Sequence, residues 1–169
     1  KALFENTTGT RNIAIGSNAN DLADTENDNI AIGHDTMTAQ IAGASQNIAI
    51  GSYSLDALTT GDANVAIGHN AMTTNTSGEL NVAIGYQALE ASATAAGGVA
   101  IGSKALKVNT ADYNTAIGYL ALTANTTGTL NTAVGHASLD ALTTGTEQIA
   151  IGGASLTLAT TGTANTAVG

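Results

Sequence analysis

Cysteine, proline and tryptophan are absent from this chain, and aromatic side chains make up only 3% of its 169 residues. Without cysteine the chain can form no disulfide framework and no cysteine-ligated metal site. Without proline every residue keeps its backbone N–H, which suits a chain of repeated hydrogen-bonded strands. Its apolar residues are mostly Ala, Ile, Leu and Val, so we expect a thin core of small side chains, unlike that of a globular enzyme.

Basic residues are also scarce. The chain has 4 Lys and Arg against 13 Asp and Glu, for a net charge of −9. Nucleic acid and anionic membranes are therefore poor partners, because both require a basic face. No apolar run reaches the length of a transmembrane helix, so we expect no membrane insertion of this segment.

The chain is organised by the pentapeptide Asn-x-Ala-[Ile/Val]-Gly, which first stands complete at residues 12–16. A fixed period of this kind indicates a solenoid. Neither end of the chain carries a polar capping repeat, so we expect residues 1–169 to be one repetitive segment, an uncapped excerpt of a longer fibre protein. The repeat glycines, spaced 16 to 18 residues apart, are Gly16, Gly33, Gly51, Gly68, Gly85, Gly102, Gly118, Gly135, Gly152 and Gly169.

Positions are numbered here from the repeat glycine. Position −1 is Ile or Val, position −2 is Ala in every copy, and position −3 is Ile, Val or Thr. Alternation of this kind predicts a strand whose −3 and −1 side chains share one face. We expect the branched face to line the interior of the coil. The Ala face should meet another subunit or sheet, because a solvated face would vary in size.

The second half of each repeat is less regular. The glycine ends the strand, because glycine alone adopts positive φ or permits close backbone approach without cost. Position +4 is Leu or Met in most copies and predicts a second short strand, with Asn20 as the exception. A polar loop such as Thr59-Thr60-Gly61 follows, and the length changes fall in this loop, at 40–46 and 109–113.

Together these features predict an all-β fold, a parallel β-roll of about ten 17-residue coils stacked ~4.8 Å apart. Asn occupies position −4 in most copies, with Gly98 and Gln148 as exceptions, and we expect its amides to form a ladder along the stack. A roll this thin buries few large side chains against the entropy of ordering its backbone. We therefore predict an oligomer, with three chains as the preferred number.

The repeat resembles the YadA-like head repeat of trimeric autotransporter adhesins, and it is also similar to repeats in tail-fibre proteins of phages and bacteria. The resemblance rests on segments such as Asn114–Gly118, followed by Ala121-Leu122 and by Asn125–Gly128. It implies a left-handed β-solenoid, a homotrimer, and an extracellular place on a bacterial cell surface or a virion tail fibre. It also implies attachment to a host-surface protein, matrix or glycan. The repeat is longer than that of the best-known adhesin heads, and the resemblance carries no catalytic residue.

His34, His69 and His136 each follow a repeat glycine, at a position where other copies have Ser, Tyr or Gly. If this position faced a threefold axis, three imidazoles could hold a metal ion. The alternation with Ser and Tyr favours a plain polar turn, so no metal site is predicted there.

Asp21, Asp24, Glu26 and Asp28 form an acidic loop whose oxygens could bind Ca²⁺. The glycine and terminal Glu of an EF-hand loop are missing, however, and so is the calcium-binding β-roll pattern. We therefore interpret the loop as solvated and predict no metal.

Other polar motifs are weaker. The Thr pairs raise the hypothesis of an ice-binding face, although adjacent Thr residues on a strand point in opposite directions and supply only one row. N-glycosylation acceptor patterns begin at Asn6, Asn75 and Asn125, in loops expected to be exposed. Sparse titratable residues without a convergent pair predict no enzyme, no catalytic residue and no cofactor. The sequence thus favours a structural or adhesive segment of a trimeric fibre; the alternative is a monomeric ice- or calcium-binding β-solenoid.

Overall fold

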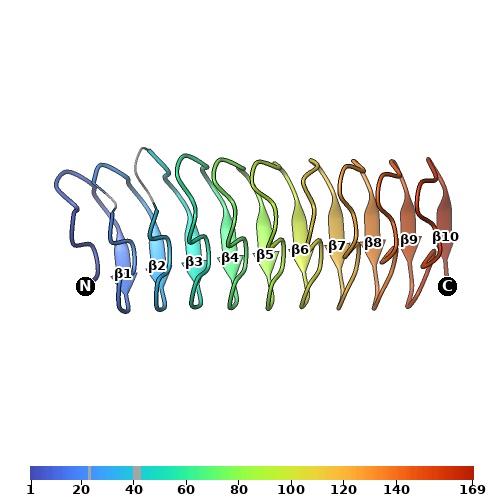
Figure 1. Ribbon diagram of the computed structural model, residues 1–169, viewed down its shortest axis with the longest axis horizontal. Helices are drawn as coiled ribbons and strands as arrows, with labels where there is room; N and C mark the ends of the chain where they lie inside the picture. Colours follow the sequence, from blue (N-terminus) through green and yellow to red (C-terminus); the bar gives the residue numbers. More distant parts are fainter. Residues whose placement is uncertain (23, 40–42) are drawn as a thin grey trace.

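The computed structural model describes residues 1–22, 24–39 and 43–169, and these residues form a β-solenoid of parallel strands without a helix. Each coil contributes one three-residue strand, and the ten strands pair in chain order to form one sheet (Figure 1). The predicted all-β class and parallel β-solenoid are therefore confirmed. The strands are β1 (Ile13–Ile15), β2 (Ile30–Ile32), β3 (Ile48–Ile50), β4 (Val65–Ile67), β5 (Val82–Ile84), β6 (Val99–Ile101), β7 (Thr115–Ile117), β8 (Thr132–Val134), β9 (Ile149–Ile151) and β10 (Thr166–Val168).

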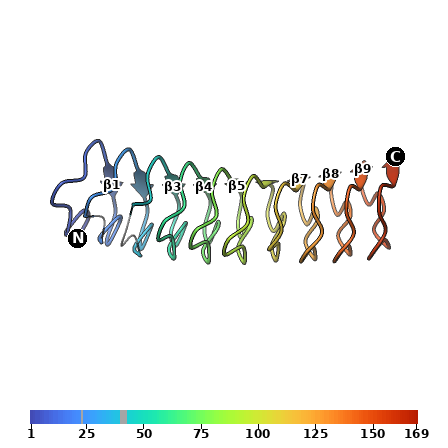
Figure 2. The same cartoon turned by 90° about the horizontal axis from the view of Figure 1, so that it is seen from above.

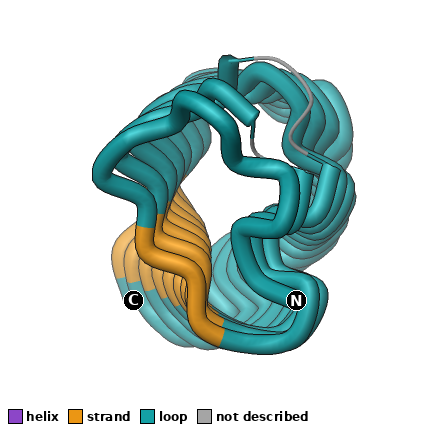
Figure 3. The backbone as a smooth tube through the Cα atoms, turned by 90° about the vertical axis from the view of Figure 1, so that its left-hand side faces the viewer, coloured by secondary structure: helices purple, strands orange, loops and turns teal. Residues whose placement is uncertain are grey.

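The strands form one side of a rod, and turns and loops form the rest of each coil. Seen from above, they follow one another along one edge of the rod (Figure 2). Seen along the rod, they lie one behind another (Figure 3). The register is uniform, because each strand pairs Ala with Ala, as in Ala66↔Ala83 and Ala83↔Ala100. Every sequence position of the strand thus becomes a straight row along the rod.

The expected orientation of the strand is wrong. The position −2 alanines of β2 to β9 are fully buried within the single chain, whereas the −3 and −1 residues point outward and are half-buried or exposed. The alanines belong to the same core cluster as Leu and Met from position +4, such as Met72 and Leu89. The large side chains from the opposite wall occupy most of the interior, so the strand contributes only methyl groups.

The Leu and Met residues lie in turns, so the predicted second strand is also wrong. Met72, Leu89 and Leu106 have φ of 53°, 50° and 50°, in the left-handed region that interrupts a strand. Their side chains are nevertheless fully buried, as expected. Backbone bonds still join neighbouring coils here; for example, Leu89 N donates to Ala105 O at 3.0 Å.

The repeat glycines combine a positive φ with close backbone contact between coils, and each of these conditions favours glycine. Gly118 has a φ of +139°, and a Cβ there would lie 2.3 Å from the carbonyl oxygen of Gly135. The same clash recurs from coil to coil, because each of these glycines lies against the next. Glycine is thus required both by the turn that ends the strand and by the close stacking of coils.

The amide ladder is confirmed. Asn64 Oδ1 accepts hydrogen bonds from the backbone N–H of Asn81 and from its side-chain amide, both at 3.1 Å. Asn81 Nδ2 also donates to the carbonyl of Ala95 at 2.8 Å, which ties the strand to the loop of the next coil. At Gly98 the side-chain ladder stops, although the Gly98 N–H still bonds Asn81 Oδ1 at 2.8 Å. These buried amides therefore have the partners that burial requires.

Candidate functional site

One outward feature of the solenoid is the apolar surface of the sheet. We define the branched face as the −3 and −1 residues of β1 to β10, which are Ile, Val or Thr throughout. In-register pairing arranges them in two parallel rows along the rod. Several members are well exposed, including Ile84 at 36%, Ile117 at 38% and Ile151 at 42%. An apolar surface this continuous is unusual for a monomer and is typical of an interaction surface.

A second outward feature is a row of rings beside the branched face. We define the ring row as His34, Tyr53, His69 and Tyr86 on four successive coils, followed after a gap by Tyr119 and His136. Neighbouring ring centroids in the first group lie 5.6, 5.8 and 5.8 Å apart. The Tyr119 and His136 rings stack at 5.5 Å.

The three histidines do not form a metal site within the chain. A tyrosine ring lies between His34 and His69, and His136 belongs to the separate second group. The His34 Nδ1 instead lies 3.1 Å from a carboxylate oxygen of Asp35. Across the described residues, no group of three or more His, Cys, Asp or Glu is placed to hold a metal ion.

The four carboxylates of the predicted acidic loop do not converge. Glu26 is buried and accepts hydrogen bonds from the backbone N–H of Gly43 at 2.8 Å and of Thr25 at 2.9 Å. Asp24 accepts a hydrogen bond from the Thr7 hydroxyl. The prediction of a solvated loop is therefore wrong at Glu26, whose carboxylate is needed for local hydrogen bonds, whereas Asp24 is exposed.

Asp28 pairs instead with one of the few basic residues. Arg11 Nε and Nη2 donate to its two carboxylate oxygens at 2.5 and 2.7 Å. The hydrogen bond from Arg11 lowers the pKa of Asp28 and raises the pKa of Arg11. The pair is exposed and joins the first two coils at the surface.

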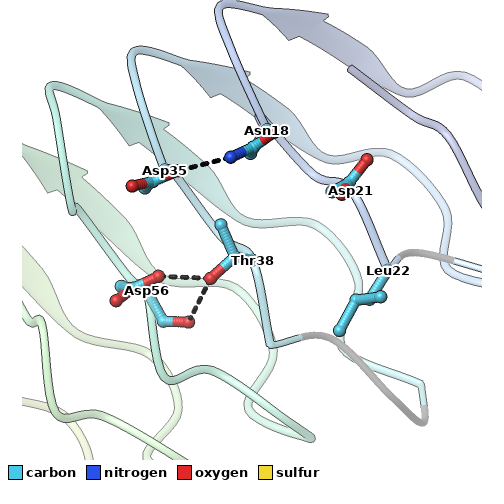
Figure 4. A pocket seen from close by; sticks show the side chains of 6 residues that line it. All are labelled: Asn18, Asp21, Leu22, Asp35, Thr38 and Asp56. Atoms are coloured by element: carbon cyan, nitrogen blue, oxygen red, sulfur yellow. Dashed lines mark hydrogen bonds between the residues drawn. The ribbon is translucent and has the colours of Figure 1, made fainter. Parts of the chain in front are cut away.

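Asp21 lines an open hollow of about 380 Å³ with Asn18, Leu22, Asp35, Thr38 and Asp56 (Figure 4). The Asn18 amide donates to Asp35 at 2.9 Å, and the Thr38 hydroxyl donates to Asp56. These bonds link adjacent coils and use part of the polar lining. The hollow is acidic and shallow, and neither its geometry nor its contacts select a ligand.

The Thr loops use their hydroxyls for the fold. Thr59, Thr126 and Thr143 each donate from Oγ1 to a backbone carbonyl of the next coil, at 2.9 to 3.0 Å. The first Thr of a pair is therefore committed to coil stacking. The second Thr, such as Thr127 or Thr144, is exposed, and Thr126 is exposed as well although its hydroxyl is hydrogen-bonded.

The predicted exposure of the glycosylation motifs is wrong at two positions. Asn75 and Asn125 are fully buried, and each donates to a glycine carbonyl three residues later, at 3.1 and 2.8 Å. Asn6 makes the same contact with Gly9 at 3.2 Å. These amides hold the loop in shape, so in the folded chain Asn75 and Asn125 are closed to a modifying enzyme.

Sequence reasoning missed both outward features. The sequence pattern places the branched face in the interior, and Tyr53 does not fit the ring position because it follows its repeat glycine by two residues instead of one. The available signal was the tolerance of Thr at position −3, as in Thr115 and Thr132, which suits a surface better than a core. No protein-family model, no curated protein and no solved structure matches this chain.

Proposed function

We propose that this segment is part of an extracellular homotrimeric fibre that projects or contributes to surface attachment. The observation that carries the proposal is the branched face, a half-buried to exposed strip of Ile, Val and Thr side chains that runs along all ten strands. In a trimer, the three strips would pack around the fibre axis and remove this surface from water. The buried apolar area would add the stabilisation that a thin coil lacks.

The resemblance to adhesin head and tail-fibre repeats supports the same assembly, a left-handed roll repeated around a threefold axis. A bacterial cell surface or a virion tail would display such a fibre. The acidic composition suits a solvated rod, and three identical outer surfaces would give weak contacts multivalent strength. The work of the segment is then mechanical and adhesive.

The test is the solution mass of the segment by light scattering. We expect the mass of three chains for the native segment. Replacing Ile84 and Ile117 by Asp should lower that mass to one chain, because two charges per protomer would be buried at the interface. Leu158→Asp is the matched control: Leu158 is 92% exposed and lies outside the branched face, so its variant should keep the native mass.

A folded native monomer would contradict the trimeric fibre. It would favour the alternative of a monomeric ice- or calcium-binding solenoid, for which a thermal hysteresis assay and a calcium titration are the direct measurements. A trimer that persists with both Asp substitutions would place the interface elsewhere on the coil.

A further inference from the structure

The ring row concentrates most of the chain's rings at one edge. The chain holds 4 Tyr, 1 Phe and 3 His, and all but Phe4 and Tyr113 belong to the row. The fold does not require a ring there, since Ser17, Ser52 and Ser103 occupy the same position in other coils. In the coil that has Ser52, the next residue, Tyr53, supplies the ring and keeps the row continuous. This continuity indicates a role beyond folding.

The rings remain open to solvent after packing on one another. Tyr53 is 36% exposed and Tyr86 is 48% exposed, and the His34 side chain is 52% exposed. Spacings of 5.6 to 5.8 Å between centroids form a linear track over four coils, from His34 to Tyr86. An extended ligand with a short repeat could therefore contact several rings at once.

Planar polar groups accompany the rings. Asp35, Asn70 and Gln87 directly follow His34, His69 and Tyr86, respectively. The Asn70 amide has no hydrogen-bond partner among the residues that the structure describes, so both its donor and its acceptor are available. Gln87 uses its NH₂ group on Glu90 at 2.7 Å and keeps its carbonyl. Three of the four rings from His34 to Tyr86 thus have an accessible hydrogen-bonding group on the next residue, whereas Tyr53 is followed by the buried Ser54.

The charge around the track excludes anionic ligands. No Lys or Arg occurs between Arg11 and Lys104, whereas Asp35 and Glu90 lie close to the row. Nucleic acid or a sulfated polymer would meet like charge there. A suitable ligand is uncharged, extended, apolar on its faces and rich in hydroxyl groups.

We propose that the ring row from His34 to Tyr86 binds an extended neutral oligosaccharide. The rings lie edge-to-face from His34 to His69, at 72° and 73°, and nearly parallel from His69 to Tyr86, at 24°. The C–H groups of successive sugars would pack on the parts of the rings that remain exposed, while Asp35, Asn70 and Gln87 would bond the hydroxyls. This inference rests on the proposed attachment function, since it names the class of ligand that the fibre surface takes. Repetition of the row on each protomer would convert weak single sites into avid binding.

The experiment measures binding of linear hexasaccharides of glucose, N-acetylglucosamine and mannose to the segment, by saturation-transfer NMR and calorimetry. A sulfated heparin hexasaccharide is the charged comparison. We expect at least one neutral hexasaccharide to bind and the sulfated one not to bind. Absence of binding by all three neutral probes, or preference for the sulfated one, would overturn the proposal.

The variant that locates the site is the double substitution His69→Ser and Tyr86→Ser, because Ser is native to this position in other coils. It should weaken binding about tenfold or more, since two ring contacts are lost. Tyr113→Ser is the matched control: Tyr113 is 61% exposed but lies outside the row, so affinity should not change. Unchanged affinity in the double variant would refute the assignment.

Light scattering on the same samples separates the two proposals. A trimer that binds no neutral saccharide would remove the ring-row site and leave the fibre. A monomer that binds one would remove the trimer and leave the ring row.

Discussion

The two sides of each strand both repeat in sequence and are opposite in burial. On the inner side, alanines such as Ala83 and Ala100 are fully buried against the Leu and Met column. On the outer side, the repeated but more variable Ile, Val and Thr residues stay half-buried or exposed. Repetition on the inner side follows from the limited interior of the coil. Repetition on the outer side has no such cause within the chain, and the proposed assembly would supply one.

The largest loss of stability on substitution is expected at the repeat glycines, where neighbouring coils come closest. Gly118→Ala places a Cβ 2.3 Å from the Gly135 carbonyl oxygen at a φ of +139°. We expect the free energy of unfolding, measured by urea denaturation, to fall by about 3 kcal/mol or more from strain and overpacking together. Gly153→Ala is the control, because a Cβ at Gly153 meets nothing within 4 Å. Equal effects of the two changes would contradict the stacking argument.

The contrast between the two sides can be tested on a single strand, β7. Ala116→Leu should lower the free energy of unfolding by about 1–3 kcal/mol, because the filled interior has no room for three more carbons. Thr115→Leu, one residue earlier on the outer side, should change it by less than about 0.5 kcal/mol. Thermal and urea unfolding of both variants provide the measurement. A larger loss from Thr115→Leu than from Ala116→Leu would restore the original expectation that the branched residues face inward.

One residue of the buried Leu and Met column is polar, and replacing it should stabilise the chain. Asn20 is fully buried at the Leu position, and neither polar atom of its side chain has a hydrogen-bond partner. Its φ of 50° equals that of Leu55, so Leu fits the backbone there. Asn20→Leu should raise the free energy of unfolding by about 1–2 kcal/mol, because it replaces an unpaired amide with apolar packing.

The matched control for Asn20 is a buried Asn that does have partners. Asn81→Leu removes hydrogen bonds to Asn64, Ala95 and Gly98 and should destabilise the chain. Stabilisation by both substitutions would show that the amide ladder contributes nothing to the stack.

The smallest expected effect lies on the surface, at Arg11 and Asp28. Because Arg11 lowers the pKa of Asp28, the pair stabilises the fold at pH values above the ordinary Asp value, near 4. This contribution is lost as the pH falls through the lowered pKa of Asp28 and the carboxylate becomes protonated. Arg11→Gln should therefore lower Tm slightly at pH 7 and leave it unchanged near pH 2. A Tm difference that persists at pH 2 would point to packing instead of charge.

Much of the fold could be predicted from the repeat, but its orientation could not. The period, the parallel pairing, the glycine turns and the Asn ladder follow from residue spacing and backbone chemistry. The inward face does not, because Ala at −2 and Ile or Val at −3 and −1 are all apolar and an alternating pattern reads the same from either side. The ring row could be predicted only in part: His34 and His69 share one repeat position in the sequence, whereas the folded structure shows that the Tyr53 ring lies between them.

The repeat alone makes the chain a stack of regular coils, because a fixed period forces each coil to meet a copy of itself. Which side chains lie inside each coil depends on how the turns and the strand pack together. The Leu and Met side chains of the turns fill the interior first, so the strand can contribute nothing larger than Ala and must turn its branched side chains outward. The branched face, on which the proposed assembly depends, is therefore at the surface because the interior has no room for its side chains.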